Sequence, residues 1–277
     1  MKTAARALIV CAIAIGFSGC ADTALKAAVL QQLGLKATPL TSGPGGGGFV
    51  ASNGVNTATG LWGGIWTYDS DGALTAIDLG GSGQITNGTA SDFGADGIVA
   101  WGKWTSGTVS ASFTAPIAGS QLKVMQYAVS GTTPSTATVN GLARSYSAYR
   151  SSPPTIDKLG TVTAGAADSV TGTVTLNYAA NNVTYSLTIV IGSHTFSLSN
   201  PGTPGVFQFV FPAGVGNFLA NGTLTSSTDN VAGYVGIIQF GPMLQGMIFG
   251  TAAERLVLNY GFTVPSLGNV SGSVVFK

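Results

Sequence analysis

The feature that most constrains this chain is a strict alternation of apolar and polar side chains in its middle. Val174, Leu176 and Tyr178 alternate with polar residues, and the same period of two runs from residue 183 to 191 after an Ala-Ala-Asn-Asn turn at 179–182. Successive side chains of a strand point to opposite faces, so the pattern predicts two antiparallel strands with one buried face.

Short runs of this kind recur from residue 49 onward, each bounded by Asn, Gly, Pro or Asp. Asn-Gly or Asp-Gly pairs, which favour tight hairpin turns, stand at 71–72, 87–88, 96–97 and 221–222. The predicted strands are 61–68, 73–77, 98–104, 109–113, 123–129, 142–149, 171–179, 183–192, 193–199, 206–211, 219–225, 233–239, 247–252, 257–263 and 270–276. The chain is therefore predicted to be all-β, and many short strands favour a barrel or a sandwich.

Composition favours the barrel. Only 8% of the residues are charged, and 41 are Gly. An open sheet this poor in Lys and Glu would expose unprotected edges, which closure removes, and glycines permit the sharp coiling of a small barrel. We predict an eight-stranded antiparallel barrel over residues 120–277, with a smaller β-rich part over 49–119 packed against it. A single larger sandwich is the alternative.

An eight-stranded barrel is just wide enough for its own side chains to fill. We therefore expect a filled interior, with any ligand on the loops or the outer rim, and the stretch 151–168 as a ligand-facing loop. A hollow, lipocalin-like barrel is the competing model. The predicted inward-facing residues are Val183, Tyr185, Leu187, Ile189, Phe207, Phe209, Phe211 and Phe249.

The N-terminus has the pattern of an export signal. Two basic residues, Lys2 and Arg6, precede an apolar stretch of 11 residues, Ala7–Phe17, which is too short to span a bilayer as a helix. Ser18-Gly19-Cys20 follows and resembles the lipobox of bacterial lipoproteins, although Phe17 stands where that motif usually has Leu. The resemblance implies a signal peptide over residues 1–19 and an acylated Cys20. The alternative is an ordinary secretory signal that leaves Cys20 as a free thiol.

The cysteine count agrees with acylation. Cys11 lies in the predicted signal, and no cysteine follows Cys20, so the mature chain can form no internal disulfide. Residues 20–48 are predicted to link the anchor to the folded body. They comprise a short amphipathic helix over 22–35 and a glycine-rich tether over 42–48.

The numbers of charged residues and histidines in the sequence exclude several classes of function. A net charge of +1 with dispersed basic residues gives no basic patch for nucleic acid. His194 is the only histidine, which excludes multi-histidine metal sites and most nucleophilic triads. We interpret it as a half-exposed residue at a strand end, with a haem-iron ligand as the alternative. The acidic residues Asp69, Asp92 and Asp96 fall in turn contexts, and Glu254 is predicted to pair with its neighbour Arg255.

Two aromatic and glycine-rich stretches resemble a known family. Residues 246–255 (GMIFGTAAER) are similar to an element near the end of the C-terminal barrel of transferrin-binding protein B-like surface lipoproteins, and residues 96–104 (DGIVAWGKW) resemble an element upstream of such barrels. The resemblance implies a lipid-tethered barrel on a bacterial outer membrane that binds a host protein or a nutrient ligand. It assigns no binding residue.

The sequence thus predicts a non-enzymatic binding protein, held in the bacterial outer membrane by an acyl group on Cys20. It implies no catalytic residue, metal or cofactor. Two alternatives stay open. An integral outer-membrane barrel would show an outward-facing apolar belt, and a carbohydrate-active protein would need two positioned carboxylates in one cleft.

Overall fold

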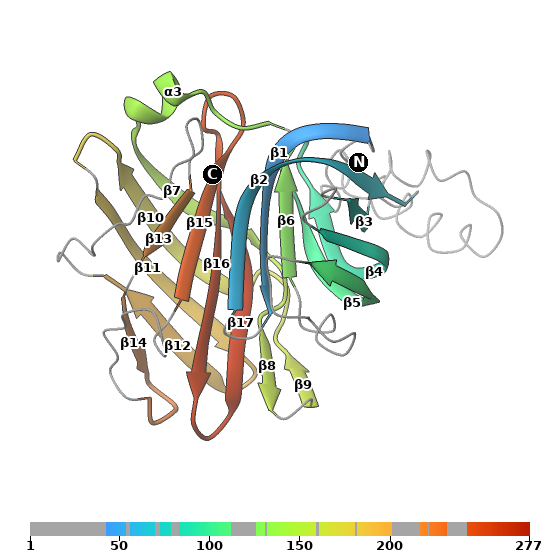
Figure 1. Cartoon of the computed structure of the whole chain (residues 1–277). Coiled ribbons are helices and arrows are strands. Elements are labelled where there is room, and N and C mark those ends of the chain that lie inside the picture. The colour runs from blue at the N-terminus through green and yellow to red at the C-terminus, as the bar shows by residue number, and fades with distance from the viewer. Residues whose placement is uncertain are drawn as a thin grey trace, which may run out of the picture. The chain divides into compact units, whose positions relative to one another are not determined.

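Two antiparallel sheets make up the described part of this computed structural model (Figure 1). The structure describes residues 43–53, 56–69, 73–78, 83–111, 126–130, 132–158, 161–180, 182–200, 217–220, 222–231 and 243–277. All of them belong to one compact unit, residues 39–277. The predicted signal, Cys20 and the predicted helix at 22–35 lie outside the described residues.

The first sheet is a closed barrel of six strands. They are β1 (Gly43–Asn53), β2 (Asn56–Tyr68), β3 (Leu74–Asp78), β4 (Gly83–Ala95), β5 (Ala100–Ala111) and β6 (Gln126–Ser130). The ring closes because β6 pairs with β1 on one side and with β5 on the other.

This barrel departs from two predicted boundaries. β1 begins at Gly43, so most of the glycine-rich stretch predicted as a tether is a strand, with Gly43 opposite Trp66 and Gly47 opposite Trp62. β6 closes the first barrel although residues 126–130 were predicted within the second part. Ladder hydrogen bonds come from the backbone, so a glycine run with no side-chain pattern can pair when a partner strand is supplied.

The second sheet forms from the rest of the chain. Its strands are β7 (Ala143–Ser151), β8 (Thr155–Lys158), β9 (Thr161–Ala164), β10 (Val170–Asn177), β11 (Asn182–Ile191), β12 (His194–Ser199), β13 (Asn217–Ala220), β14 (Thr223–Ser226), β15 (Met243–Phe249), β16 (Arg255–Val264) and β17 (Gly268–Phe276). The main path is β13-β15-β16-β17-β7-β10-β11-β12-β14, with β8 paired to β17 and β9 paired to β8. A short helix, α3 (Thr136–Asn140), precedes β7.

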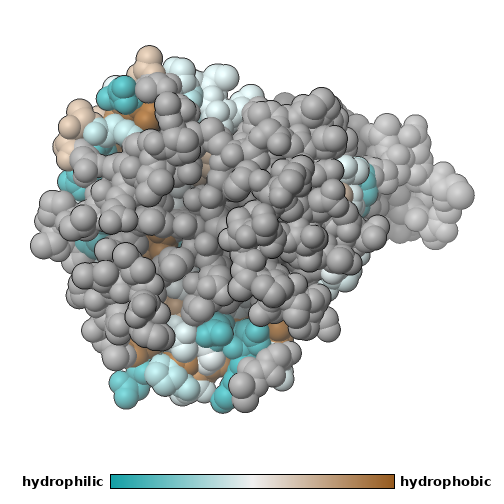
Figure 2. Space-filling view, viewed as in Figure 1, coloured by the Kyte–Doolittle hydropathy of each residue, from teal (hydrophilic) through white to brown (hydrophobic). Residues whose placement is uncertain are grey.

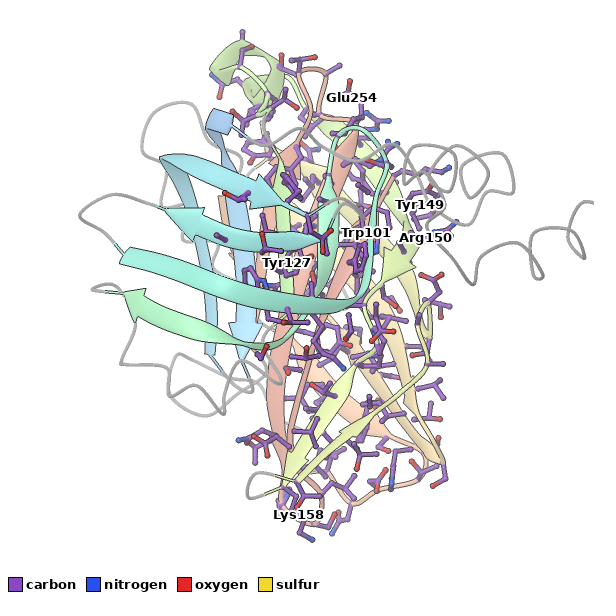
Figure 3. All side chains as sticks on the ribbon, turned by 90° about the vertical axis from the view of Figure 1, so that its right-hand side faces the viewer. Trp101, Tyr127, Tyr149, Arg150, Lys158 and Glu254 are labelled. Carbon is purple, nitrogen blue, oxygen red and sulfur yellow. The ribbon has the colours of Figure 1, made fainter. Side chains whose placement is uncertain are left out.

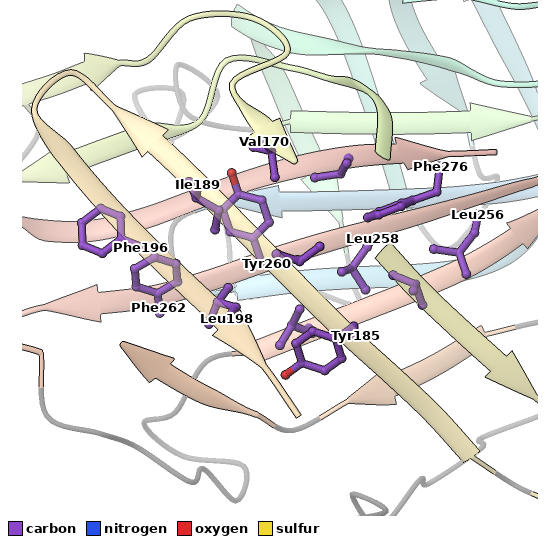
Figure 4. Close-up of a cluster of buried hydrophobic side chains, with 14 of the residues drawn as sticks. Val170, Tyr185, Ile189, Phe196, Leu198, Leu256, Leu258, Tyr260, Phe262 and Phe276 are labelled. Atoms are coloured by element: carbon purple, nitrogen blue, oxygen red, sulfur yellow. The ribbon is translucent and has the colours of Figure 1, made fainter. Parts of the chain in front are cut away.

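The second sheet curls on itself. Four strands stand between β16 and β12 in the sheet order, yet the rings of Phe262 and Phe196 pack edge to face with centroids 5.3 Å apart (Figure 4). The predicted all-β class, with a barrel-like antiparallel sheet in the C-terminal half and a smaller β-rich part before it, is confirmed. Within the described pairings, ring closure is seen in the first sheet, and β13 is not joined to β14.

The interior of the curled sheet is filled with side chains. Aromatic and aliphatic residues from β7 to β17 form one cluster, in which Tyr260 and Phe196 have no exposed surface. The predicted inward positions Val183, Tyr185, Leu187 and Ile189 all lie in this cluster. Phe207, Phe209 and Phe211 lie outside the described residues.

Strands β15, β16 and β17 are buried on both faces. Their second face packs against the first barrel, where Phe249, Val257 and Val275 meet Val99 and Trp101. Phe249 was predicted to fill the second barrel. The prediction was wrong because alternate residues of β15 point in opposite directions, and Ile248 takes the inward position.

The stretch 151–168, predicted as a loop, contains a β-hairpin, and the residues that lead into this hairpin are buried. Residues 151–156 are buried, and Thr155–Lys158 and Thr161–Ala164 form β8 and β9. Within the described part of the chain, no helix is long and apolar enough to cross a membrane.

Candidate binding surface at a strand bulge

The predicted lipid-attachment residue, Cys20, lies outside the described residues, so its acylation stays a prediction. The described residues contain no group of three or more His, Cys, Asp or Glu side chains that could hold a metal ion. The two tryptophans at 101 and 104 have core positions on opposite faces of β5, as strand geometry predicts. Trp101 packs toward the second sheet, while the ring of Trp104 lies 4.4 Å from that of Tyr127.

His194 is the half-exposed strand-end residue that the sequence indicated. It begins β12, and its Nδ1 lies 3.0 Å from the Asp229 carboxylate. Thr228 Oγ1 donates to the same carboxylate at 2.7 Å. The hydrogen bond from Thr228, together with that from His194, lowers the pKa of Asp229. The Asp229 carboxylate thus has His194, Ser226 and Thr228 as hydrogen-bond partners, and these contacts stabilise the turn after β14.

The acidic turn residues act on the backbone. The Asp69 carboxylate accepts the N–H of Ala73 at 2.9 Å, next to residues 70–72, which lie outside the described part. Asp96 Oδ1 accepts the N–H groups of Ile98 and Val99 in the turn between β4 and β5. Asp92 lies instead within β4, at a positive φ of 49°, where the register shifts.

A bulge in β7 brings a tyrosine and an arginine together on one face of the second sheet. Val275 of β17 pairs with Arg150, and Phe276 pairs with Ala148. Tyr149 is therefore an extra residue of β7 that has no paired residue on β17. In a regular strand, Tyr149 and Arg150 would point to opposite faces. The bulge re-aims one of them, and both side chains lie on the face that carries Val275.

Three cations surround the ring of Tyr149. The Lys277 ammonium lies 4.1 Å from the ring centroid, and the guanidinium carbons of Arg150 and Arg255 lie 4.6 and 5.7 Å from it. We call these four residues the Tyr149 cluster. They come from three neighbouring strands or strand ends, because β16, β17 and β7 are adjacent in the sheet. Figure 3 shows Tyr149 and Arg150 together on β7, close to Trp101.

Arg255 ties the cluster to the first barrel. Its Nε donates to Asp96 Oδ2, and the two side chains are only 18% and 5% exposed. The predicted pairing of Arg255 with Glu254 is wrong. The Glu254 carboxylate accepts the N–H of Ala252, and Arg255 reaches only the backbone oxygen of Glu254. The side chains of Glu254 and Arg255 point to different partners at this hairpin, so these two neighbours in sequence do not form an ion pair with each other.

Arg150 is held more loosely. Asp168 Oδ2 lies 3.9 Å from its Nη1, and the two side chains are 39% and 50% exposed. Asp168 Oδ1 instead accepts the N–H of Ser151 at 2.9 Å, from a residue with a positive φ of 57°. Lys277 is exposed. Arg150 and Lys277 thus present positive charge to solvent beside an aromatic ring.

The residues of the family-like stretch 246–255 have structural roles. Gly250 adopts a φ of +85° at the end of β15, and its N–H donates to the backbone oxygen of Thr132. The backbone oxygen of Ala253 accepts from Tyr146 Oη at 2.8 Å and from Arg144 Nη1 at 3.1 Å. The stretch therefore forms a hairpin that is hydrogen-bonded to β7 and to the segment before α3.

Comparison with known proteins gives a likeness of fold. No family model and no curated protein matches the chain. Solved structures that resemble it include isotype 1 transferrin-binding protein B from serogroup B Neisseria meningitidis, at 12% identity over 83% of this chain and 43% of that chain, with a TM-score of 0.43. An intact transferrin-binding protein B with N and C lobes has 14% identity, covering 83% of this chain and 46% of that chain, with a TM-score of 0.41.

A mutant of the Haemophilus parasuis Hp5 protein has 12% identity over 83% of this chain and 44% of that one, with a TM-score of 0.41. These structures belong to the family that the two sequence stretches resemble. The chain spans less than half of their length, and at this identity the likeness concerns fold alone.

Proposed function

We propose that the chain is a non-enzymatic binding protein, anchored through Cys20 to a bacterial outer membrane and displayed at the cell surface, which meets its ligand on the outside of its β-body. The observation that carries this proposal is the filled interior of the second sheet. Its partner would be the host protein or nutrient ligand that the sequence resemblance implies.

The described side chains of the second sheet pack closely against one another in its interior. Tyr260 and Phe262 stack there with ring centroids 6.3 Å apart, and Phe262 also contacts Phe196. Tyr260 reaches so far across β17 that a Cβ at Gly272 would stand 2.0 Å from its hydroxyl. Interiors packed in this way exclude ligands unless side chains move. A ligand is therefore expected on the surface.

The outer face of the second sheet favours a body that lies in water rather than in lipid. Along β10, the residues that alternate with the core, Thr171, Thr173 and Thr175, are exposed, as is Ser186 on β11. A barrel that spans a membrane needs apolar residues at such positions. Among the described residues, Val190 is the exposed large hydrophobic side chain, and the described atoms in Figure 2 mix polar and apolar colours.

The carbohydrate-active alternative receives no support from the described carboxylates. Hydrolysis of a glycosidic bond needs an acid and a base that are free to exchange protons. Asp96 is engaged by Arg255 and by two backbone N–H groups, and Asp229 by His194, Thr228 and Ser226. These carboxylates have the contacts of structural groups.

Two measurements test the proposal. Metabolic labelling with a palmitate analogue should mark the native protein and leave Cys20→Ser unlabelled. Native mass spectrometry of the purified protein should show the mass of the chain from Cys20 onward with its acyl group and no further small molecule. An unlabelled native protein contradicts the anchor, and a stoichiometric hydrophobic ligand contradicts the filled interior.

A further inference from the structure

We propose that the Tyr149 cluster is a docking site for an acidic segment of a partner protein, whose carboxylates contact Arg150 and Lys277 beside the Tyr149 ring. The inference rests on the proposed function, because it gives the surface-binding body a defined contact site and a class of partner.

The first argument is the bulge itself. It costs the β7–β17 ladder one regular pairing, and its effect is to place Tyr149 and Arg150 on the same face. Bulges occur preferentially where a side chain must be re-aimed. Here the re-aimed pair stands beside Lys277 and Arg255, so three of the chain's 11 basic residues gather around one ring.

The second argument is the balance of charge at the cluster. The charged groups that face it are the cations Arg150, Arg255 and Lys277 and the carboxylates Asp96 and Asp168. Asp96 neutralises Arg255 in a buried pair, whereas Asp168 stays 3.9 Å from Arg150. Within the described part of the chain, no carboxylate lies within ion-pair distance of Lys277. Lys277 therefore has no carboxylate partner in the described part of the chain, and Arg150 has only a long, exposed ion pair with Asp168, so both can attract an incoming anion.

The third argument concerns the type of anion. Arg150 Nη1 donates to the backbone oxygen of Tyr149 at 2.9 Å and lies 3.9 Å from Asp168 Oδ2. A guanidinium has five N–H donors, so its other N–H groups can donate to a carboxylate of the partner. Arg150 and Lys277 reach the ring from adjacent strands, and adjacent strands lie about 4.8 Å apart. The positive groups thus spread over an exposed sheet surface, which suits the side chains of an extended acidic segment.

The experiment measures binding of a fluorescent oligoglutamate peptide to the full-length protein by anisotropy at low salt. The double variant Arg150→Ala/Lys277→Gln should bind about tenfold more weakly, since each exposed ion pair contributes roughly threefold. Tyr149→Phe should bind as the native protein does, because the ring remains, whereas Tyr149→Leu should weaken binding about threefold.

The matched control is Lys158→Gln. Lys158 is an exposed cation on the β8–β9 hairpin whose ammonium donates to the backbone oxygen of Ser266, outside the cluster. It should leave binding of the peptide unchanged. In 1 M salt, where the Debye length falls to about 3 Å, the native protein should lose most of its affinity. Unchanged thermal melting of each variant shows that it is folded.

Three results would overturn the proposal. One is an unchanged affinity in the double variant, and another is an equal loss in Lys158→Gln, which would show diffuse attraction. The third is binding of phosphatidylglycerol vesicles, but not of oligoglutamate, that depends on Arg150 and Lys277, which would assign the site to a membrane. Acyl labelling and native mass spectrometry are separate readouts, so failure of this site and failure of the proposed function are distinguishable.

Discussion

The two sheets fill their interiors in different ways. The six-stranded barrel places a few large rings directly over glycines. A Cβ at Gly102 would stand 2.6 Å from the Tyr127 hydroxyl, and one at Gly88 would stand 2.8 Å from Trp104 Nε1. The second sheet also places rings over glycines, Tyr260 over Gly272 and Tyr185 over Gly222. Most of its core, however, lies at alternating positions of many strands, such as Val183 and Leu187 on β11.

Register differs between one strand pair of each sheet, although β1 and β2 of the first barrel also pair without a shift and β17 and β7 of the second sheet pair with one. The β4–β5 pair of the first barrel shifts register at three places, whereas β10 and β11 pair without a shift from Val170 opposite Ile189 to Asn177 opposite Asn182. Regular alternation aligns two strands along their whole length, because a slip by one residue would turn every apolar side chain outward. A ring that packs over a glycine fixes the pairing of two strands only at that position, and the register can shift between such contacts. The comparison predicts that the sheets respond differently to substitution.

The largest expected effect is in the second core. Phe262→Ala removes a ring that contacts both Phe196 and Tyr260, and it should lower the free energy of unfolding by about 4 kcal/mol if the space cannot collapse. Urea denaturation measures the change. Val190→Ala, at an exposed position of β11, is the control and should alter stability by less than about 0.5 kcal/mol. A loss below about 1 kcal/mol for Phe262→Ala would mean that the interior is loosely packed.

The next effect tests the junction between the two sheets. Arg255→Ala leaves the buried Asp96 carboxylate without its cation and should cost about 3 kcal/mol in unfolding free energy. Asp96→Asn combined with Arg255→Met should recover much of that loss, because no isolated charge remains. If the double variant is as unstable as Arg255→Ala, the ion pair is not the cause.

A smaller effect tests the ring-over-glycine packing of the first barrel. Gly102→Ala should cost about 2 kcal/mol, since the added methyl would overlap the Tyr127 hydroxyl and Cβ of Phe93. Gly141→Ala is the matched control. A Cβ at Gly141 meets its nearest atom at 3.8 Å, and its φ of −91° suits alanine. Equal melting temperatures for the two variants would refute the packing argument.

Alkaline pH offers a test of the second sheet. Burial raises the pKa of Tyr146 to about 12, partly offset by Arg144, so the folded state favours the protonated phenol. The resulting stabilisation is complete below about pH 10, the ordinary tyrosine pKa, and is lost as pH rises toward 12. Ultraviolet titration should show Tyr146 ionising at a higher pH in native protein than in protein unfolded by guanidinium. Tyr146→Phe identifies its contribution.

The smallest effect concerns the exposed turn after β14. Thr228→Val removes the hydrogen bond that contributes most to lowering the pKa of Asp229, so this pKa should rise toward its ordinary value. Because the folded-state pKa is depressed, the stabilisation is present above the ordinary pKa and lost as pH falls through the lowered one. Carboxyl chemical shifts, followed by NMR against pH, measure it. Ser226→Ala should shift the pKa less.

Sequence predicted the second sheet far better than the first. The strands at 171–179, 183–192, 193–199, 257–263 and 270–276 agree with β10, β11, β12, β16 and β17 within a few residues. In the first barrel, β1 and β4 were missed, and β5 was predicted as two shorter strands. In the second sheet, β8 and β9 were missed, because the stretch 151–168 was predicted as a loop. Alternation is a local signal, whereas glycine-rich strands owe their pairing to partners elsewhere in the chain.

The candidate site was beyond sequence reasoning. Tyr149 and Arg150 are ordinary residues of an alternating strand until β17 supplies the register that makes Tyr149 a bulge. Arg255 was assigned to its neighbour Glu254, because nothing local indicates that a turn 159 positions earlier carries its partner, Asp96.

The sequence by itself therefore determined the all-β class, the alternating strands of the second sheet and the inward-facing residues of β11, because apolar periodicity specifies which face of a strand is buried. Only the tertiary structure decided that a glycine run closes a barrel, that Phe249 faces the first barrel, and that three cations gather on Tyr149. Those features depend on strand pairing and register between distant segments, and such contacts leave no pattern along the chain.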